Sequence, residues 1–237
     1  MTAPTELLAL VDAAHRRVED LLAGLTDADA RAPSILPGWS IGHVVTHIAR
    51  NADSFAWLTS AAIAGEAAHQ YPGGTEQRDA DIETGSGRSA NVLVADVRSA
   101  HLRLATLWQL TPDGVWASGR GTGGNGTPTT APEWVLRRMR EAEVHRTDTG
   151  LGGLTWRDWP DDFVDAQLGD GPHLGPDGQL APFVANVVAG TNPVELVATD
   201  RPGRWTLAAP DSVGDPVTVE ADRRTLLAWL MGRTDRP

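Results

Sequence analysis

Two pairs of side chains with metal-ligating chemistry occur at helical spacing. Glu141 and His145 lie four residues apart in a segment with helical periodicity, so their side chains project from one face of a helix. His43 and His47 have the same spacing in an earlier segment. One Glu and two His from facing helices would leave a fourth position open on a tetrahedral ion, which is typical of a catalytic zinc site.

The apolar residues of the earlier segment favour His47 over His43 as the third ligand. The core-facing side chains expected there are Ile41, Val44, Val45, Ile48, Ala52 and Phe55. His47 flanks this stripe on a helical projection, whereas His43 lies nearer the opposite face. An alternative stays open, because a Glu and a His four residues apart also form ordinary ion pairs on a solvated face, which Arg138 and Asp148 would extend.

The helices that must position these residues follow from apolar periodicity. Four segments in the first two-thirds of the chain predict helices, at residues 4–25, 40–65, 89–110 and 130–150. Ser40 is a suitable N-cap for the second helix, and Gly150 is a suitable terminator for the fourth. We therefore expect a four-helix bundle, with a polar stretch at residues 69–87 between its second and third helices.

A glycine-rich segment at residues 119–127 superficially resembles a phosphate-binding loop. It lacks the GK[ST] ending, and no apolar strand precedes it, so a nucleotide site is not supported. The segment is better interpreted as a loop near a site or as an exposed hairpin.

The pattern changes after Gly150. A short helix is expected at residues 156–168, followed by alternating apolar segments at 193–199, 204–208 and 216–220 that predict a small antiparallel sheet. Asp222 would cap a final helix. The fold class is therefore α+β, with a four-helix bundle at residues 1–153 and a small α+β domain at residues 154–237.

Composition excludes several classes of protein. The 237 residues include 20 basic and 31 acidic side chains, and a net charge of −11 argues against nucleic-acid and membrane partners. The chain has no cysteine, which excludes disulfides and a cysteine nucleophile, and no lysine, which excludes Schiff-base chemistry. No apolar run approaches the about 18 residues of a membrane helix, and no signal peptide is recognisable, so we expect a cytoplasmic protein.

Residues 37–52 and 140–148 resemble the mycothiol-dependent maleylpyruvate isomerases, which belong to the wider DinB-like group of metal-binding four-helix bundles. In that family the second histidine of the G-W…H-x-x-x-H segment and the E-x-x-x-H of the fourth helix bind zinc. The resemblance thus implies His47, Glu141 and His145 as ligands. Residues 77–82 and 226–233 also resemble the family, and the closing G-R pair implies Arg233 as a catalytic residue.

The resemblance further implies zinc as the metal and mycothiol as a thiol cosubstrate. The implied reaction converts maleylpyruvate to fumarylpyruvate, a step of gentisate degradation, by thiolate addition, bond rotation and elimination. The substrate is a small dicarboxylate, for which Arg233 is the first candidate clamp and Arg78 and Arg138 are further ones. The family implies a monomer.

Two other functions remain open. A mycothiol S-transferase would use the same metal and thiol on an electrophilic small molecule and leave the thiol attached. A non-catalytic protein would store or sense a metal or an apolar ligand, an idea supported by the similarity of the C-terminal part to sterol-carrier folds.

Overall fold

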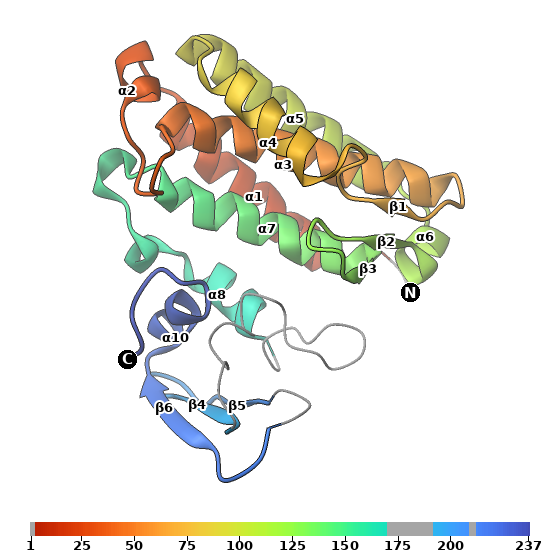
Figure 1. The fold of residues 1–237 in the computed structure, drawn as a ribbon. Helices are drawn as coiled ribbons and strands as arrows, with labels where there is room; N and C mark the ends of the chain where they lie inside the picture. The colour runs from red at the N-terminus through yellow and green to blue at the C-terminus, as the bar shows by residue number, and fades with distance from the viewer. Residues whose placement is uncertain (1–2, 170–191, 209–211) are drawn as a thin grey trace. The chain divides into compact units, whose positions relative to one another are not determined.

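The computed structural model describes residues 3–169, 192–208 and 212–237 (Figure 1). The chain divides into two compact units, Met1–Thr155 and Trp156–Pro237. The predicted boundary between folding domains at residues 153 and 154 stays a prediction. In the described part of the chain, no helix combines the length and the apolar character needed to cross a bilayer.

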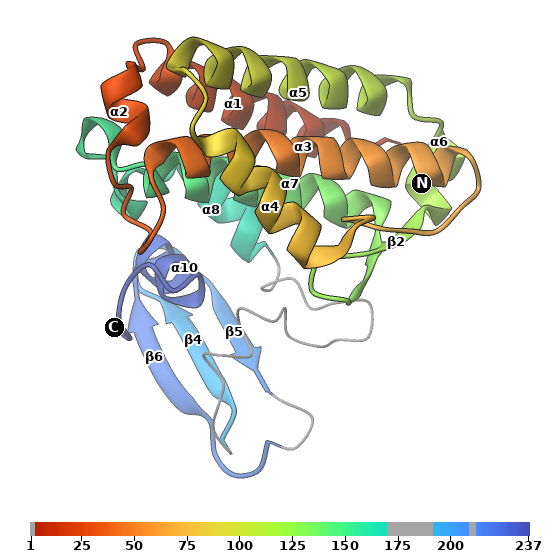
Figure 2. The same cartoon turned by 45° about the horizontal axis from the view of Figure 1, so that its top comes forward.

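The first unit confirms the predicted four-helix bundle. Its long helices are α1 (Thr5–Leu22), α3 (Ile41–Ile63), α5 (Ala90–Leu110) and α7 (Ala131–Asp148). Helix α3 packs on α5 and α7, and α1 packs on the same two helices (Figures 1 and 2). Ser40 caps α3 by accepting the His43 N–H, and Thr130 forms a capping box with Glu133 at the start of α7. These caps fix where the two helices that carry the candidate ligands begin.

Three short helices complete the unit: α2 (Asp27–Arg31), α4 (Gly74–Ser86) and α6 (Asp113–Ser118). Helix α4 lies in the stretch for which the sequence predicts only polar character. It buries only Ile82 and Gly85, so it has almost no apolar periodicity to detect. It packs along α3, where a Cβ at Gly42 would overlap the Ser86 carbonyl oxygen. This close approach brings Arg78 of α4 to α3.

The glycine-rich segment forms a hairpin, which was one of its two interpretations. Strand β2 (Arg120–Thr122) pairs antiparallel with β3 (Pro128–Thr130) and parallel with β1 (Ala68–His69). The hairpin is not fully exposed, since Gly121 is buried and a Cβ there would press on Leu58 and Trp134. The hairpin therefore packs onto α3 and α7.

The second unit combines short helices with a three-stranded sheet. Its elements are η2 (Trp156–Asp158), α8 (Asp161–Leu168), β4 (Val194–Ala198), β5 (Arg204–Leu207), β6 (Val217–Ala221) and α10 (Arg223–Leu230), and the turn η1 (Leu151–Gly153) precedes them in the first unit. The strand order is β5-β4-β6, and Asp222 caps α10 by accepting the Thr225 N–H, as predicted. Leu196 at the centre of β4 is buried.

The prediction of a purely antiparallel sheet is wrong in one pairing. Strands β4 and β5 are antiparallel, but β6 pairs in parallel with β4 on its other edge. Successive strands alternate in direction along the chain, but β4 and β6, which are neighbours in the sheet, run in the same direction. Strand β6 lies on the edge of β4 opposite β5, so β5 and β6 do not form a hairpin.

Candidate metal centre

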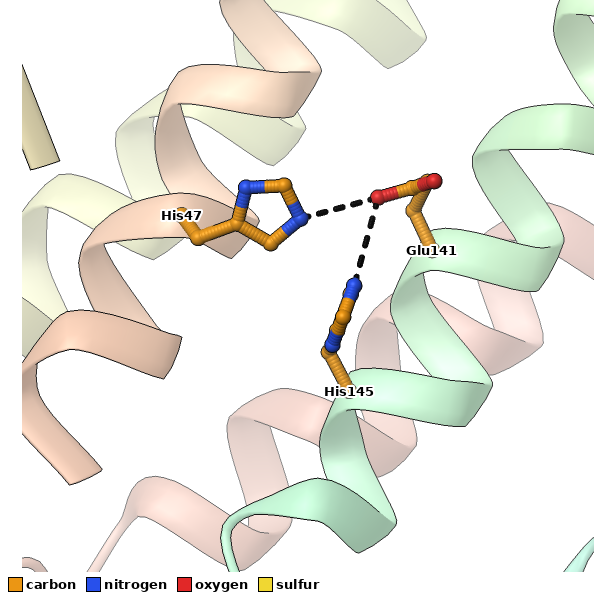
Figure 3. A group of neighbouring side chains, drawn as sticks. All are labelled: His47, Glu141 and His145. Carbon is orange, nitrogen blue, oxygen red and sulfur yellow. Dashed lines mark hydrogen bonds and ion pairs between the residues drawn. The ribbon is translucent and has the colours of Figure 1, made fainter. Parts of the chain in front are cut away.

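The three predicted ligands converge between α3 and α7 (Figure 3). The Nε2 of His47 lies 2.9 Å from Oε2 of Glu141, and the Nε2 of His145 lies 3.5 Å from the same oxygen. One ligand atom from each residue falls within 4.8 Å of the other two. Donors placed at about 2 Å around one tetrahedral ion are separated by about 3.4 Å, so two imidazoles and a carboxylate at this spacing fit a single divalent ion.

Asp148 orients His145. Its side chain is fully buried, and its Oδ2 accepts a hydrogen bond of 2.8 Å from Nδ1 of His145. Because an ionised carboxylate only accepts, the proton stays on Nδ1 and leaves Nε2 to face Glu141. Carboxylate–histidine pairs of this kind fix the tautomer of a metal ligand and raise its basicity.

Arg78 and Trp39 hold His47. An arginine can only donate, so Nη2 of Arg78 donates to Nδ1 of His47 at 3.2 Å. The Nε2 proton of His47 then points at Glu141. The Trp39 ring meets the imidazole edge-on, with centroids 5.7 Å apart. An ion held at Nε2 would move the proton to Nδ1, and the Arg78 guanidinium would then have to turn away from that nitrogen.

Burial and mutual charge set the protonation of the three residues. Burial is the main cause that lowers the pKa of His47 to about 4, so this ring is neutral at neutral pH. Burial opposes ionisation of Glu141, but hydrogen bonds from His145 and His47 together hold its pKa well below the ordinary value. Burial also disfavours charge on His145, yet Asp148 and Glu141 raise its pKa to about 8. The ion-free site thus pairs a cationic His145 with an anionic Glu141.

The sequence of residues 11–150 matches the family described as Mycothiol maleylpyruvate isomerase N-terminal domain. The chain belongs to the mycothiol maleylpyruvate isomerase family. The matched range contains all three candidate ligands, whereas Arg233 lies outside it. No curated protein sequence matches the chain.

Two solved structures share the fold of this isomerase-family chain. A crystal structure of the mycothiol-dependent maleylpyruvate isomerase has 23% sequence identity and a TM-score of 0.79, covering 98% of this chain and 90% of the other. A structure of a histidine-to-alanine mutant of the mycothiol-dependent maleylpyruvate isomerase has 22% identity and a TM-score of 0.78, covering 97% and 89%. The likeness extends over both units and supports the α+β fold class.

Arg138 does not belong to the site of this isomerase-family chain, although it lies near Glu141 in sequence. Its side chain is fully buried in the bundle core, where every guanidinium nitrogen donates a hydrogen bond. The acceptors, which come from the three other long helices, are His15, the Ile48 carbonyl, Asn51 and His101. The alternative in which Arg138 extends a solvated face is therefore wrong, and Arg138 cannot clamp a substrate.

Arg233 lies directly after α10 in the second unit. Gly232 adopts a positive φ of 66°, the Arg233 N–H donates to the Ala228 carbonyl, and Nη1 donates to the Met231 carbonyl at 2.7 Å. These bonds close the end of α10 in the manner of a helix cap. The catalytic role that the family resemblance implies for Arg233 stays a prediction.

The sequence pattern does not single out Arg137, on which the Glu141 carboxylate acts, or Tyr71, which contacts Arg78. Arg137 lies one helical turn before Glu141, and that spacing is the signal that could have found it. Tyr71 precedes α4, and its ring lies under the guanidinium of Arg78, 5.8 Å from the ring centroid. No spacing in the sequence announces that contact, because it depends on how α4 packs.

Proposed function

We propose that this protein is a metal- and mycothiol-dependent isomerase that converts maleylpyruvate to fumarylpyruvate, a step of gentisate breakdown. The observation that carries the proposal is the His47–Glu141–His145 cluster inside the part of the chain that matches the isomerase family. The names of the two similar crystal structures support the same activity. The monomeric state and cytoplasmic location stay predictions of the sequence.

His47, Glu141 and His145 would hold the ion, and their two nitrogens and one oxygen suit zinc. A divalent ion there would lower the pKa of a thiol that binds it and so supply a thiolate at neutral pH. Asp148 would keep His145 oriented toward the ion throughout. Since the chain has no cysteine, the sulfur must come with the cosubstrate.

The chemistry follows from the restricted rotation of a cis double bond. When the mycothiol thiolate forms a C–S bond with one alkene carbon, the π electron pair moves onto the conjugated ketone as an enolate. The remaining C–C single bond rotates. The enolate pair then re-forms the alkene in its trans geometry, and the C–S bond breaks to return the thiolate. No proton is gained or lost over the cycle.

The protein's own side chains would bind and orient the substrate in this scheme. Two carboxylates and a developing enolate need positive charge, and arginine matches them through paired N–H donors. Arg233 is the residue that the family resemblance implies for this task. Arg78 of the first unit is a further candidate, because its guanidinium already contacts His47.

The deciding experiment combines zinc-loaded protein, substoichiometric mycothiol and maleylpyruvate, with the product followed by proton NMR. The proposal expects the trans alkene of fumarylpyruvate with many turnovers for each mycothiol. One equivalent of a stable thioether without fumarylpyruvate would instead identify an S-transferase. Zinc binding without any reaction of maleylpyruvate would leave a non-catalytic metal-binding protein.

A further inference from the structure

Arg137 is a half-buried cation on α7. Within residues 3–169, 192–208 and 212–237, its guanidinium makes neither a hydrogen bond nor an ion pair. Burial lowers its pKa, and the carboxylates that act on it are those of Glu133 and Glu141. A guanidinium offers five N–H donors, and leaving such donors unsatisfied inside a protein is costly. The position therefore suits an anionic ligand that supplies the missing acceptors.

The turn of the glycine-rich hairpin lies against this guanidinium. A Cβ at Gly123 would come within 3.2 Å of Nη1 of Arg137, and a Cβ at the next residue, Gly124, would come within 2.9 Å of the Tyr71 ring. The Gly124 N–H donates to Oε1 of Gln70 at 3.0 Å, which ties the turn to the segment that carries Tyr71. Because neither residue has a side chain, the turn can pack closely against Arg137 and Tyr71.

The same contacts continue to the metal ligands. The Arg78 guanidinium lies over the Tyr71 ring, and in the ion-free protein its Nη2 donates to Nδ1 of His47. An ion at Nε2 of His47 would release this donor for an anion. His47 meets Glu141, which lies one helical turn from Arg137 on α7. Arg137 is thus linked to the ligands in two ways. One is along α7 to Glu141, and the other is through the hairpin turn, Tyr71 and Arg78 to His47. Arg78 of α4 and Arg137 of α7 therefore both lie near the ligand cluster.

We propose that Arg137 and Arg78 form a carboxylate-binding subsite beside the metal ligands, with the glycine-rich turn as its wall. Paired N–H donors of arginine fit a carboxylate. Asp79 already pairs with Nη1 of Arg78, so an anion would draw mainly on Arg137 and on the other nitrogens of Arg78. The subsite selects an anionic substrate at this end of the cluster. The identification of the anion as one carboxylate of a dicarboxylate rests on the proposed function.

The test is binding of fumarate to zinc-loaded protein in the absence of thiol, titrated to millimolar concentrations by saturation-transfer NMR. Arg137→Gln should weaken fumarate binding by about tenfold or more, the loss expected for one charge-assisted hydrogen-bonding group. Arg137→Lys should restore part of the affinity, because it retains the charge without the fork. Gly123→Ala should also weaken binding, because its methyl group enters the space beside Nη1 while every charge remains.

Arg16→Gln is the matched control, since Arg16 is an exposed arginine on α1. Zinc content and helical circular dichroism are measured for every variant. Unchanged fumarate affinity in folded, zinc-loaded Arg137→Gln, or no fumarate binding by the wild type, overturns the subsite. Fumarate binding that depends on Arg137 without isomerase turnover would retain the subsite and reject the proposed function. Isomerase turnover by Arg137→Gln with an unchanged KM for maleylpyruvate would retain the proposed function and reject the subsite.

Discussion

His47 and Glu141 are separated by 94 positions in the chain, yet His47 Nε2 and Glu141 Oε2 lie 2.9 Å apart. Their contact joins α3 to α7. His145 comes with Glu141, because both stand on one face of α7. Two helices therefore position the whole ligand set. A substitution that displaces a ligand on either helix should first be detected as a loss of metal binding.

Replacing a ligand should remove the metal. His47→Ala and Glu141→Ala leave two donors at most, and two protein ligands seldom hold a divalent ion. We expect zinc per chain to fall to a small fraction of the wild-type value after dialysis, measured by mass spectrometry of the metal. His43→Gln is the control. His43 lies on the same helix as His47, and glutamine at this position can still complete the capping box with Ser40. Undiminished zinc in both alanine variants would remove the ligand assignment.

Asp148→Asn should weaken the metal without removing it. The asparagine amide can present an N–H to His145 Nδ1, which no longer favours the tautomer with Nε2 free. We expect zinc affinity to fall about tenfold to a hundredfold, measured by competition with a fluorescent chelator. Asp113→Asn, on the exposed surface of α6, serves as the control. Equal affinities for wild type and Asp148→Asn would show that Asp148 has no part in orienting the ligand.

Arg233→Ala tests the residue implied by the family. If Arg233 stabilises the enolate, kcat/KM for maleylpyruvate should fall by about a hundredfold or more at unchanged zinc content. Arg236→Ala is the neighbouring control, since that side chain lies over Trp229, 5.8 Å from the ring centroid. Retained turnover at an unchanged KM in Arg233→Ala would leave this arginine with only its part in closing α10.

The core histidines should make the bundle acid-sensitive. Burial is the main cause that lowers the pKa of His101 to about 4, with Arg138 adding to it and Glu19 opposing it, and burial lowers the pKa of His15 well below 6.5. The unfolded chain binds these protons below about pH 6.5 and the folded chain does not. Stability contributed by these rings is therefore complete above pH 6.5 and is lost as the pH falls toward 4.

His101 alone should lower the free energy of unfolding by about 2 kcal/mol between pH 7 and pH 5. Urea unfolding followed by circular dichroism at the two pH values measures this difference. His101→Gln keeps an acceptor for Arg138 and removes the titrating ring, so its pH dependence should be smaller by that amount. An identical pH dependence in wild type and variant would contradict the assignment.

The ligand cluster could be predicted because its residues stand on regular helices, where a spacing of four residues decides the face. The same spacing argument did not predict the burial of Arg138 on α7. A helical projection treats a charged residue beside Glu141 as solvated, whereas its burial depends on acceptors from three other helices. Those acceptors are distant in sequence, so no pattern on α7 alone reveals them.

Other features were hidden for related reasons. Helix α4 buries too few apolar side chains to leave a periodic signal, although it carries Arg78 to His47. The parallel pairing of β6 with β4 depends on the path of a connection, and alternating apolar residues define a strand without naming its neighbour. Gly123 and Gly124 matter because a side chain at either position would press on Arg137 or Tyr71, which are distant in sequence.

The buried Arg138 also determines how far α7 can slide along α3. Its Nη1 donates to the Ile48 carbonyl and to Asn51, immediately beyond His47, while Glu141 on the next turn of α7 meets His47 itself. A shift of one helical turn, about 5.4 Å, would break the bonds of Arg138 to α3 and the contact of Glu141 with His47. It would also leave the buried guanidinium charge without acceptors on α3. The acceptors on α3 therefore fix the alignment of α7 with α3. Arg138 contacts no ligand, yet through this alignment it sets the distance between His47 and Glu141.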